Sequence, residues 1–479
     1  MSNTTSLSLA SKRIISLLDE GSFVEIGGAI TARTTDFNMQ QKETPADGVI
    51  TGYGVIDGNL VYVYSQDASV LKGAIGEMHA KKIANIYDMA MKMGAPVIGF
   101  VDCAGLRLQE ATDALNAFGS VYYKQAMASG VIPQITAVFG KCGGGLAVAS
   151  AMTDFTFMEG KNGKLFLNSP NAIEGNEISK CDTSSADFQS SKAGIVDVVG
   201  TEAEIMAEIR ALVSMLPANN EDDTSYDECM DDLNRACAGI ENAVEDTAIV
   251  AAMISDNNVF FETKRAYAKD MVTGFVRLNG MTVGVVANRS KVYDAEGNVT
   301  DDFGTTLSEA GCKKASDFVE FCDAFNIPIV SFVNVTGFRA CKCAEKRLAR
   351  ETAKLTYAFA NATVPKVNVV IGKAYGSAYI TMNSKAIGAD MVYAWPNSEI
   401  GMMDANLAAK IMYADEDAAT IKEKAAEYKE LQSSPMAAAR RGYVDTIIAP
   451  ADTRKYLIGA FEMLFTKRED RPAKKHGTI

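Results

Sequence analysis

The sequence predicts an α/β protein that contains two tandem copies of one unit. Short landmarks recur at a constant offset, since 328 − 96 and 376 − 144 both equal 232. The landmark pairs are Pro96 and Pro328, Gly105 and Gly337, Arg107 and Arg339, Pro133 and Pro365, Gly140 and Gly372, and Gly144 and Gly376. Within each copy, apolar strand patterns alternate with helical ones, an order typical of parallel sheets with helical crossovers. We therefore expect one domain over residues 1–235 and a second over 236–479.

Each copy is expected to begin with a β-hairpin. Residues 49–67 read as two strands joined at Asp57-Gly58, and residues 271–290 read as two strands joined at Asn279-Gly280. Both dipeptides favour tight hairpin turns. Helices are expected next, at 75–93 and 308–325, followed by strands at 96–102 and 328–334. A second pair of apolar strands is expected at 133–140 and 365–372.

The remaining segments flank or connect the two copies. Residues 7–19 predict a short amphipathic helix, and the Ala-, Lys- and Glu-rich residues 405–440 predict helices. Residues 216–247 contain scattered acids and the sequence PANNEDD, which is typical of a linker or a surface excursion.

Composition and charge narrow the class of protein. The net charge of −13, without a lysine–arginine cluster to offset it, argues against nucleic acid or an anionic membrane as the main partner. The start MSNTTSLSLASKR lacks the apolar core of a signal peptide, and no apolar run approaches about 18 residues. We therefore expect a cytoplasmic protein.

The spacing of the nine cysteines does not indicate a metal or disulfide scaffold. No CxxC motif occurs among them, so neither a zinc ribbon nor a disulfide framework is expected.

Side-chain chemistry offers few candidates for catalysis. Only two histidines occur, His79 within a predicted helix and His476 in the polar tail, and no GxSxG elbow or phosphate P-loop is present. For His79 we favour a role on the surface or in the packing of its helix. No cluster of metal ligands at catalytic spacing occurs, so we expect no metal.

The backbone offers two candidate sites instead. A strand that ends in glycines and starts a helix directs several N–H groups at one point, where they can stabilise an enolate oxygen. The donors expected in the first copy are Gly144 and Gly145, and in the second copy Ser377 and Ala378. The alternative is that these small residues only permit close packing of helix on strand.

Several long stretches resemble one enzyme family. They include LLDEGSFVEI (17–26), DGVITGYGVIDG (47–58), FVEFCDAFNIPIV (318–330), ATVPKVNVVIGKAYGSAYITMNSKAIGAD (362–390) and AARRGYVDTIIAPADTRKYL (438–457). The chain resembles, nearly end to end, the carboxyltransferase subunit of biotin-dependent acyl-CoA carboxylases and decarboxylases. That family includes propionyl-CoA carboxylase β chains and methylmalonyl-CoA decarboxylase α chains.

The resemblance implies a fold of two crotonase-like domains and a homohexamer whose active sites combine the N-half of one subunit with the C-half of another. It implies a coenzyme A thioester on the N-half, and biotin, brought by a separate carrier protein, on the C-half. Gly144 and Gly145 would then hold the thioester enolate, and Ser377 and Ala378 the ureido oxygen of biotin. The other substrate-binding residues expected are Gly105, Arg107, Gly143, Tyr375, Gly376 and Ile380.

The reaction implied is carboxyl transfer between biotin and the α-carbon of a short acyl-CoA. The resemblance implies that Ile380, just after the second turn, lines the pocket beside the acyl group, where an apolar side chain favours propionyl-CoA/methylmalonyl-CoA over acetyl-CoA/malonyl-CoA. The alternative is that Ile380 only packs in the core. The further partner is either a biotin carboxylase or a membrane decarboxylase subunit, so the direction of the reaction stays open. The chain departs from the family pattern in its turn at 103–107, in residues 336–341 and 350–354, and at Ser377, where glycine is usual.

Two alternatives remain at this point. The first is a crotonase-type hydratase or isomerase, which needs carboxylates at the thioester. Glu110 is the only acid close after the turn at 103–107. The second is a non-catalytic scaffold subunit, in which the divergent loops have lost their chemistry and assembly is retained.

Overall fold

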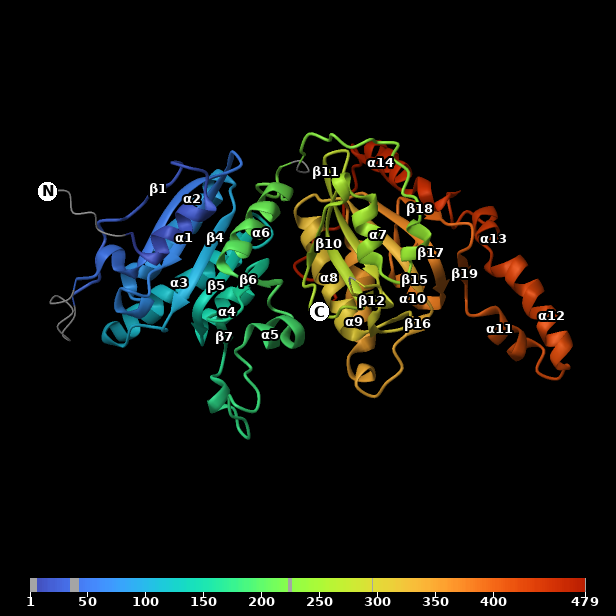
Figure 1. Cartoon of the computed structure of the whole chain (residues 1–479), viewed down its shortest axis with the longest axis horizontal. Helices are drawn as coiled ribbons and strands as arrows, with labels where there is room; N and C mark the ends of the chain where they lie inside the picture. The colour runs from blue at the N-terminus through green and yellow to red at the C-terminus, as the bar shows by residue number, and fades with distance from the viewer. Residues whose placement is uncertain (1–6, 35–42, 223–225, 295, 479) are drawn as a thin grey trace. The chain divides into compact units, whose positions relative to one another are not determined.

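The computed structural model describes residues 7–34, 43–222, 226–294 and 296–478. Residues 1–6, at the start of the sequence, and residues 223–225 of the expected linker lie outside the described residues. The chain forms two compact units, Met1–Ser225 and Tyr226–Ile479 (Figure 1).

The boundary between the units falls earlier than the expected one at 235/236. Tyr226 forms an isolated β-bridge with Met281, and the N–H of Asp227 donates to the carbonyl of Gly280. The Asp227 carboxylate also pairs with Arg277. Arg235 donates to the carbonyls of Met253 and Ser255. Residues 226–235 therefore belong with the second unit, because their partners lie in its hairpin and in the residues just before that hairpin.

Unit 1 is built on an eight-stranded sheet in the order β1-β2-β3-β4-β5-β6-β8, with β7 also paired to β5. Its strands are β1 Val24–Glu25, β2 Val49–Ile56, β3 Asn59–Gln66, β4 Val97–Cys103, β5 Gln134–Gly143, β6 Phe155–Glu159, β7 Lys164–Phe166 and β8 Val198–Gly200. Its α-helices are α1 Leu9–Leu17, α2 Glu77–Met93, α3 Ala111–Ala128, α4 Gly145–Ala151, α5 Ala186–Phe188 and α6 Glu202–Met215.

Unit 2 repeats this plan with a sheet in the order β20-β18-β17-β15-β11-β10-β9, with β19 paired to β17. Its strands are β9 Phe260–Thr263, β10 Met271–Leu278, β11 Met281–Asn288, β12 Lys291–Tyr293, β13 Val299–Asp302, β14 Thr306–Leu307, β15 Ile329–Val335, β16 Gly337–Phe338, β17 Lys366–Tyr375, β18 Met391–Ala394, β19 Glu399–Gly401 and β20 Thr446–Ile447. Its α-helices are α7 Thr247–Ile254, α8 Glu309–Ala324, α9 Leu348–Asn361, α10 Gly376–Thr381, α11 Ala405–Met412, α12 Ala418–Tyr428, α13 Pro435–Arg440 and α14 Thr453–Leu464.

The predicted repeat is confirmed element by element. Both hairpins form with the expected turns, β2 pairing β3 and β10 pairing β11 antiparallel. The strands that follow are parallel in both units, β3-β4-β5 in the first and β11-β15-β17 in the second. Because parallel strands end at the same edge of a sheet, the turns after β4 and β5 lie on adjacent strands, and so do those after β15 and β17.

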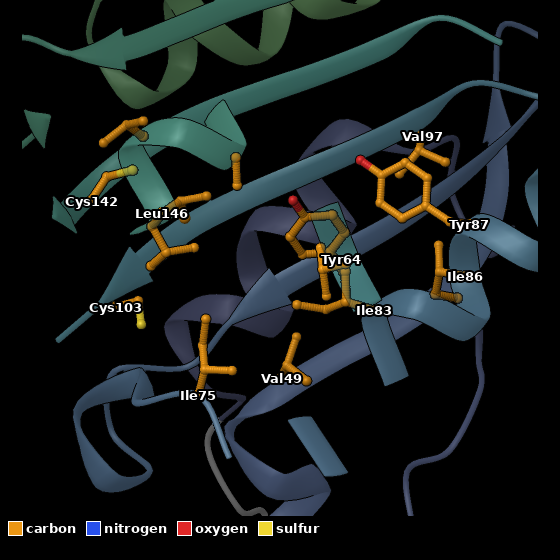
Figure 2. Close-up of a cluster of buried hydrophobic side chains, with 14 of the residues drawn as sticks. Val49, Tyr64, Ile75, Ile83, Ile86, Tyr87, Val97, Cys103, Cys142 and Leu146 are labelled. Carbon is orange, nitrogen blue, oxygen red and sulfur yellow. The ribbon is translucent and has the colours of Figure 1, made fainter. Parts of the chain in front are cut away.

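The core of unit 1 lies directly beneath its first glycine turn. Figure 2 shows Cys103 at the end of β4, Cys142 on β5 and Leu146 on α4 grouped at one end of the core. All three side chains are buried. This packing fixes the ends of the two strands, so the loops that leave them start from a rigid base. None of the described helices is long and apolar enough to cross a membrane.

Two buried lysines that the sequence analysis did not single out also repeat at the offset of 232. The Lys82 ammonium donates to the carbonyls of Ala46 and Val49. The Lys314 ammonium donates to three carbonyls, those of Lys264, Tyr267 and Met271, at 2.8–3.0 Å. Burial lowers the pKa of Lys82 to about 8 and that of Lys314 to about 7. Each lysine holds together the irregular segment that leads into the hairpin of its unit.

Candidate active site

The first glycine turn joins β5 to α4. Gly144 has φ +61° and ψ −128°, a conformation open to glycine and unfavourable for residues with a Cβ. Its N–H donates to the carbonyl of Phe166 on β7 at 2.9 Å. The expectation that Gly144 donates to a ligand is therefore not supported, because its donor is already in use. Gly145 is exposed and begins α4, so its N–H has no acceptor within the helix.

The flanking glycines are required by packing. A Cβ on Gly143 would lie 2.7 Å from the Phe166 ring, and one on Gly145 would lie 2.8 Å from the Phe118 ring. Gly143, which was expected to bind substrate, therefore has a packing requirement of its own, and its role in binding stays a prediction. Gly145 can meet both requirements. Its Cα faces the Phe118 ring, where there is no room for a side chain, and its N–H at the start of α4 is left without an acceptor in the helix.

The second glycine turn joins β17 to α10. Gly376 has φ +59°, and Ser377 lies within α10, outside the set of described residues with positive φ. The serine therefore keeps a backbone that directs its N–H as glycine would. Ser377 is exposed and Ala378 is buried, and both lie in the first turn of α10, where N–H groups lack intrahelical acceptors.

A cavity of about 370 Å³ adjoins the second turn. Gly376 and Ile380 line it from α10, and Met402 and Arg441 line it from the segments after β19 and α13. Ile380 is 38% exposed. The structure thus brings together two sequence-predicted residues and adds others from the chain between 400 and 443.

The loop after β4 contains Gly105 and Arg107. Gly105 has φ +109°, and its carbonyl accepts from the N–H of Ile75. The Arg107 guanidinium bonds Asp47 at 2.7 Å and Glu110 at 2.6 Å, and it also donates to the Ala74 carbonyl. With its side chain only 2% exposed, Arg107 does not reach a ligand at the surface. Its expected role in substrate binding is therefore replaced by support of the loop.

His79 also supports this loop from within α2. The Gln66 carbonyl oxygen accepts from the Asp102 N–H, so the Gln66 amide nitrogen faces Nε2 of His79 at 3.2 Å. Nδ1 of His79 then donates to the Asp47 carbonyl at 3.0 Å. The ring is neutral, because burial, together with the nearby Arg107 and Lys82, lowers the pKa of His79 to about 3. The packing role favoured for His79 is confirmed.

Tyr375 ends β17, and sequence reasoning placed it in the substrate site without a partner. Its hydroxyl donates to Glu399 on β19 at 2.5 Å, and Glu399 also pairs with Lys429 at 2.9 Å. Burial and the bond to Glu399 raise the pKa of Tyr375 above its ordinary value. Glu399 was missed as a site residue, although it lies at the end of YAWPNSEI (393–400), which reads as a strand and a turn. The hydrogen bond between Tyr375 and Glu399 thus ties the end of β17 to β19, whose residues Ile400 and Gly401 line the cavity.

The fold and the two glycine turns define a protein of two tandem crotonase-like domains. A crystal structure of transcarboxylase 12S, a hexamer with hydrolysed methylmalonyl-CoA bound, matches with a TM-score of 0.91 and 37% identity, covering 98% of this chain and 92% of that one. The carboxyl transferase domain model matches residues 5–479, and the chain belongs to that family.

Two relatives of known function match this chain over nearly its whole length and over most of their own. The chain is 40% identical to a methylmalonyl-CoA decarboxylase subunit alpha of Veillonella parvula, covering 98% of this chain and 92% of the relative. It is 39% identical to a propionyl-CoA carboxylase beta chain of Roseobacter denitrificans, covering 98% and 93%.

Proposed function

We propose that this chain transfers a carboxyl group between carrier-bound biotin and the α-carbon of propionyl-CoA or methylmalonyl-CoA. The observation that carries the proposal is the pair of glycine turns, each with a positive-φ glycine followed by an exposed residue at the start of a helix. Relatives named for both propionyl-CoA and methylmalonyl-CoA support the substrate.

In this proposal the first turn holds the thioester oxygen. The N–H of Gly145 is a donor there, and Gly144 sets the backbone direction. Such a donor is pre-organised, because Gly144 is held by the Phe166 carbonyl before any ligand binds. Negative charge that develops on the thioester oxygen is thereby stabilised without a side-chain acid.

The second turn holds the biotin ring in this proposal. Ser377 and Ala378 would donate N–H groups to its ureido oxygen, and the adjoining cavity of about 370 Å³ has room for a bicyclic ring with its linker. Biotin would supply the transferable carboxyl group. The protein residues contribute position and electrostatic stabilisation.

The hydratase alternative is disfavoured by the environment of Glu110. Its carboxylate accepts from Arg107 and from the N–H of Glu77, both at 2.6 Å, and the residue is 2% exposed. An acid held in this way beneath the loop is not free to exchange a proton with a substrate at the surface.

The partners we propose are a biotin carrier protein and either a biotin carboxylase or a membrane decarboxylase subunit. We also propose a cytoplasmic homohexamer, by analogy with the transcarboxylase 12S hexamer. Light scattering would test the assembly, and a stable, active monomer would contradict it.

One experiment separates the three classes of function. The purified protein is supplied with methylmalonyl-CoA and a biotinylated carrier domain, and propionyl-CoA is measured; crotonyl-CoA hydration is measured in parallel. Biotin-dependent formation of propionyl-CoA without hydration supports the proposal. Hydration alone would identify a hydratase, and neither activity in a folded oligomer would identify a scaffold.

A further inference from the structure

A group of cations lies on the loop between β16 and α9 and on the first turn of α9. Residues 339–354 contain six cations and two acids, whereas the whole chain has a net charge of −13. Four of the cations, Lys342, Lys346, Arg347 and Arg350, have exposed side chains. None of these four makes an ion pair with a residue that the structure describes. We name these four residues the basic loop.

The fold does not require the basic loop. At the offset of 232, the corresponding residues of unit 1 are Glu110, Ala114, Leu115 and Phe118, and that unit forms the same strand–loop–helix. Arg347 is the N-cap residue of α9 and Arg350 lies in its first turn. Cations at a helix N-terminus oppose the helix dipole. The basic loop is therefore unfavourable for the helix that carries it, which suggests a role in binding.

The basic loop borders the second glycine turn. It follows β16, and both β16 and α9 pack against α10. The hydroxyls of Thr356 on α9 and Thr381 on α10 lie 3.1 Å apart. Figure 1 shows the loop projecting from the end of unit 2 at which β16 and α10 lie. A partner that reaches the second turn therefore passes close to the basic loop.

The exposure of all four side chains favours a partner with many negative charges. Water competes fully with a single phosphate at an exposed cation, so one exposed pair contributes little. A patch of several cations acts through its summed field, which speeds the association of an oppositely charged surface.

We propose that the basic loop is the docking surface for an acidic protein segment that surrounds the biotin of the carrier. This inference rests on the proposed function, because it takes the second turn as the biotin site.

The test uses two synthetic biotinyl-lysine peptides. One carries four glutamates around the biotinyl-lysine, and the other carries four glutamines. We expect kcat/KM for carboxyl transfer from methylmalonyl-CoA to be about tenfold higher for the acidic peptide at low salt. The preference should disappear near 0.5 M KCl, where screening lengths fall to roughly 4 Å. Fluorescence anisotropy of the labelled peptides gives their binding independently of activity.

The variant Lys342→Glu/Arg347→Glu should abolish the preference and leave transfer to free biotin unchanged. The matched control Lys92→Glu/Lys161→Glu changes the net charge equally on exposed residues of unit 1 and should keep the preference. If the basic-loop variant retains the preference, the proposal is wrong. It is also wrong if that variant raises only the KM for methylmalonyl-CoA, since the loop would then bind coenzyme A phosphates.

Failure of the proposed function has a different result. If the wild-type protein transfers no carboxyl group to free biotin or to either peptide, the proposed function and the carrier assignment are both overturned, whatever the anisotropy shows. Activity with free biotin, together with equal binding of the two peptides, would overturn the docking surface alone.

Discussion

Gly144 and Gly376 lie 232 positions apart and adopt nearly the same positive φ, +61° and +59°. Each directly follows the longest strand of its sheet; Gly144 precedes the short helix α4, and Gly376 is the first residue of the short helix α10. The glycine is needed in both copies because this conformation is unfavourable for a residue with a Cβ. The residue after it differs, Gly145 in one copy and Ser377 in the other, and is free to differ because its φ is not positive.

The backbone direction set by Gly144 can be tested with a matched pair of alanine variants. Gly144→Ala and Gly58→Ala both place a Cβ on a positive-φ residue with open space around it, so each should cost about 1–2 kcal/mol of stability. Only Gly144→Ala should misdirect the Gly145 N–H, with a loss of about 100-fold in transfer rate. Urea midpoints and transfer rates are compared. Equal rates in the two folded variants would contradict the role of the first turn.

The donor at Ser377 can be removed without removing the helix. Proline is tolerated in the first turn of a helix, where the missing N–H has no intrahelical acceptor. Ser377→Pro should therefore lower the transfer rate by about 100–1,000-fold. Ser377→Gly keeps the N–H and should stay within about twofold of wild type. Circular dichroism and oligomer size check the fold, and a fully active, folded Ser377→Pro would refute the assignment.

Ile380 is predicted to influence the choice of acyl group. Its side chain is partly exposed and lines the cavity beside the second turn, so Ile380→Asp should not unfold the protein. We expect the propionyl-to-acetyl ratio of kcat/KM to fall several-fold, because one methylene in an apolar site contributes about 1–3 kcal/mol at most. If both rates fall together and the ratio stays fixed, Ile380 has only a structural role.

Acid should destabilise the first unit through His79. Its pKa is lowered to about 3 in the folded state, from about 6.5 when unfolded, so the unfolded state binds the extra proton between these values. The contribution of the neutral ring to the free energy of unfolding is therefore fully present above about pH 6.5. It decreases as the pH falls, and at pH 5 the loss is about 2 kcal/mol. Unfolding free energies at pH 7 and pH 5 should differ less in His79→Gln than in wild type. An unchanged difference would show that His79 is not the titrating group.

Lys314 should contribute far more stability than its neighbour Lys313. Lys314→Met removes the ammonium donor from three carbonyls, those of Lys264, Tyr267 and the buried Met271, which should cost more than about 3 kcal/mol. Lys313 is about half exposed and pairs with Asp317, so Lys313→Met should cost less than about 1 kcal/mol. Thermal midpoints of the two variants provide the comparison, and similar values would contradict the buried role.

Local signals account for the parts of the structure that the sequence predicted well. Asp57-Gly58 and Asn279-Gly280 each formed the expected hairpin turn, since this tight turn requires positive φ at both central residues and these residue types adopt it readily. The domain boundary was less accurate because it depends on where Asp227 finds its partners, in the hairpin about 50 residues further along the chain.

The amino-acid sequence by itself determined the duplication, the order of strands and helices, the family and the two glycine turns. Each of these is encoded in residue type and spacing along the chain. The tertiary structure alone decided which groups are available for chemistry. The Phe166 carbonyl occupies the Gly144 N–H, and Asp47 and Glu110 bury the Arg107 guanidinium. Availability depends on hydrogen-bond partners and burial, which are supplied by distant segments only after the chain has folded.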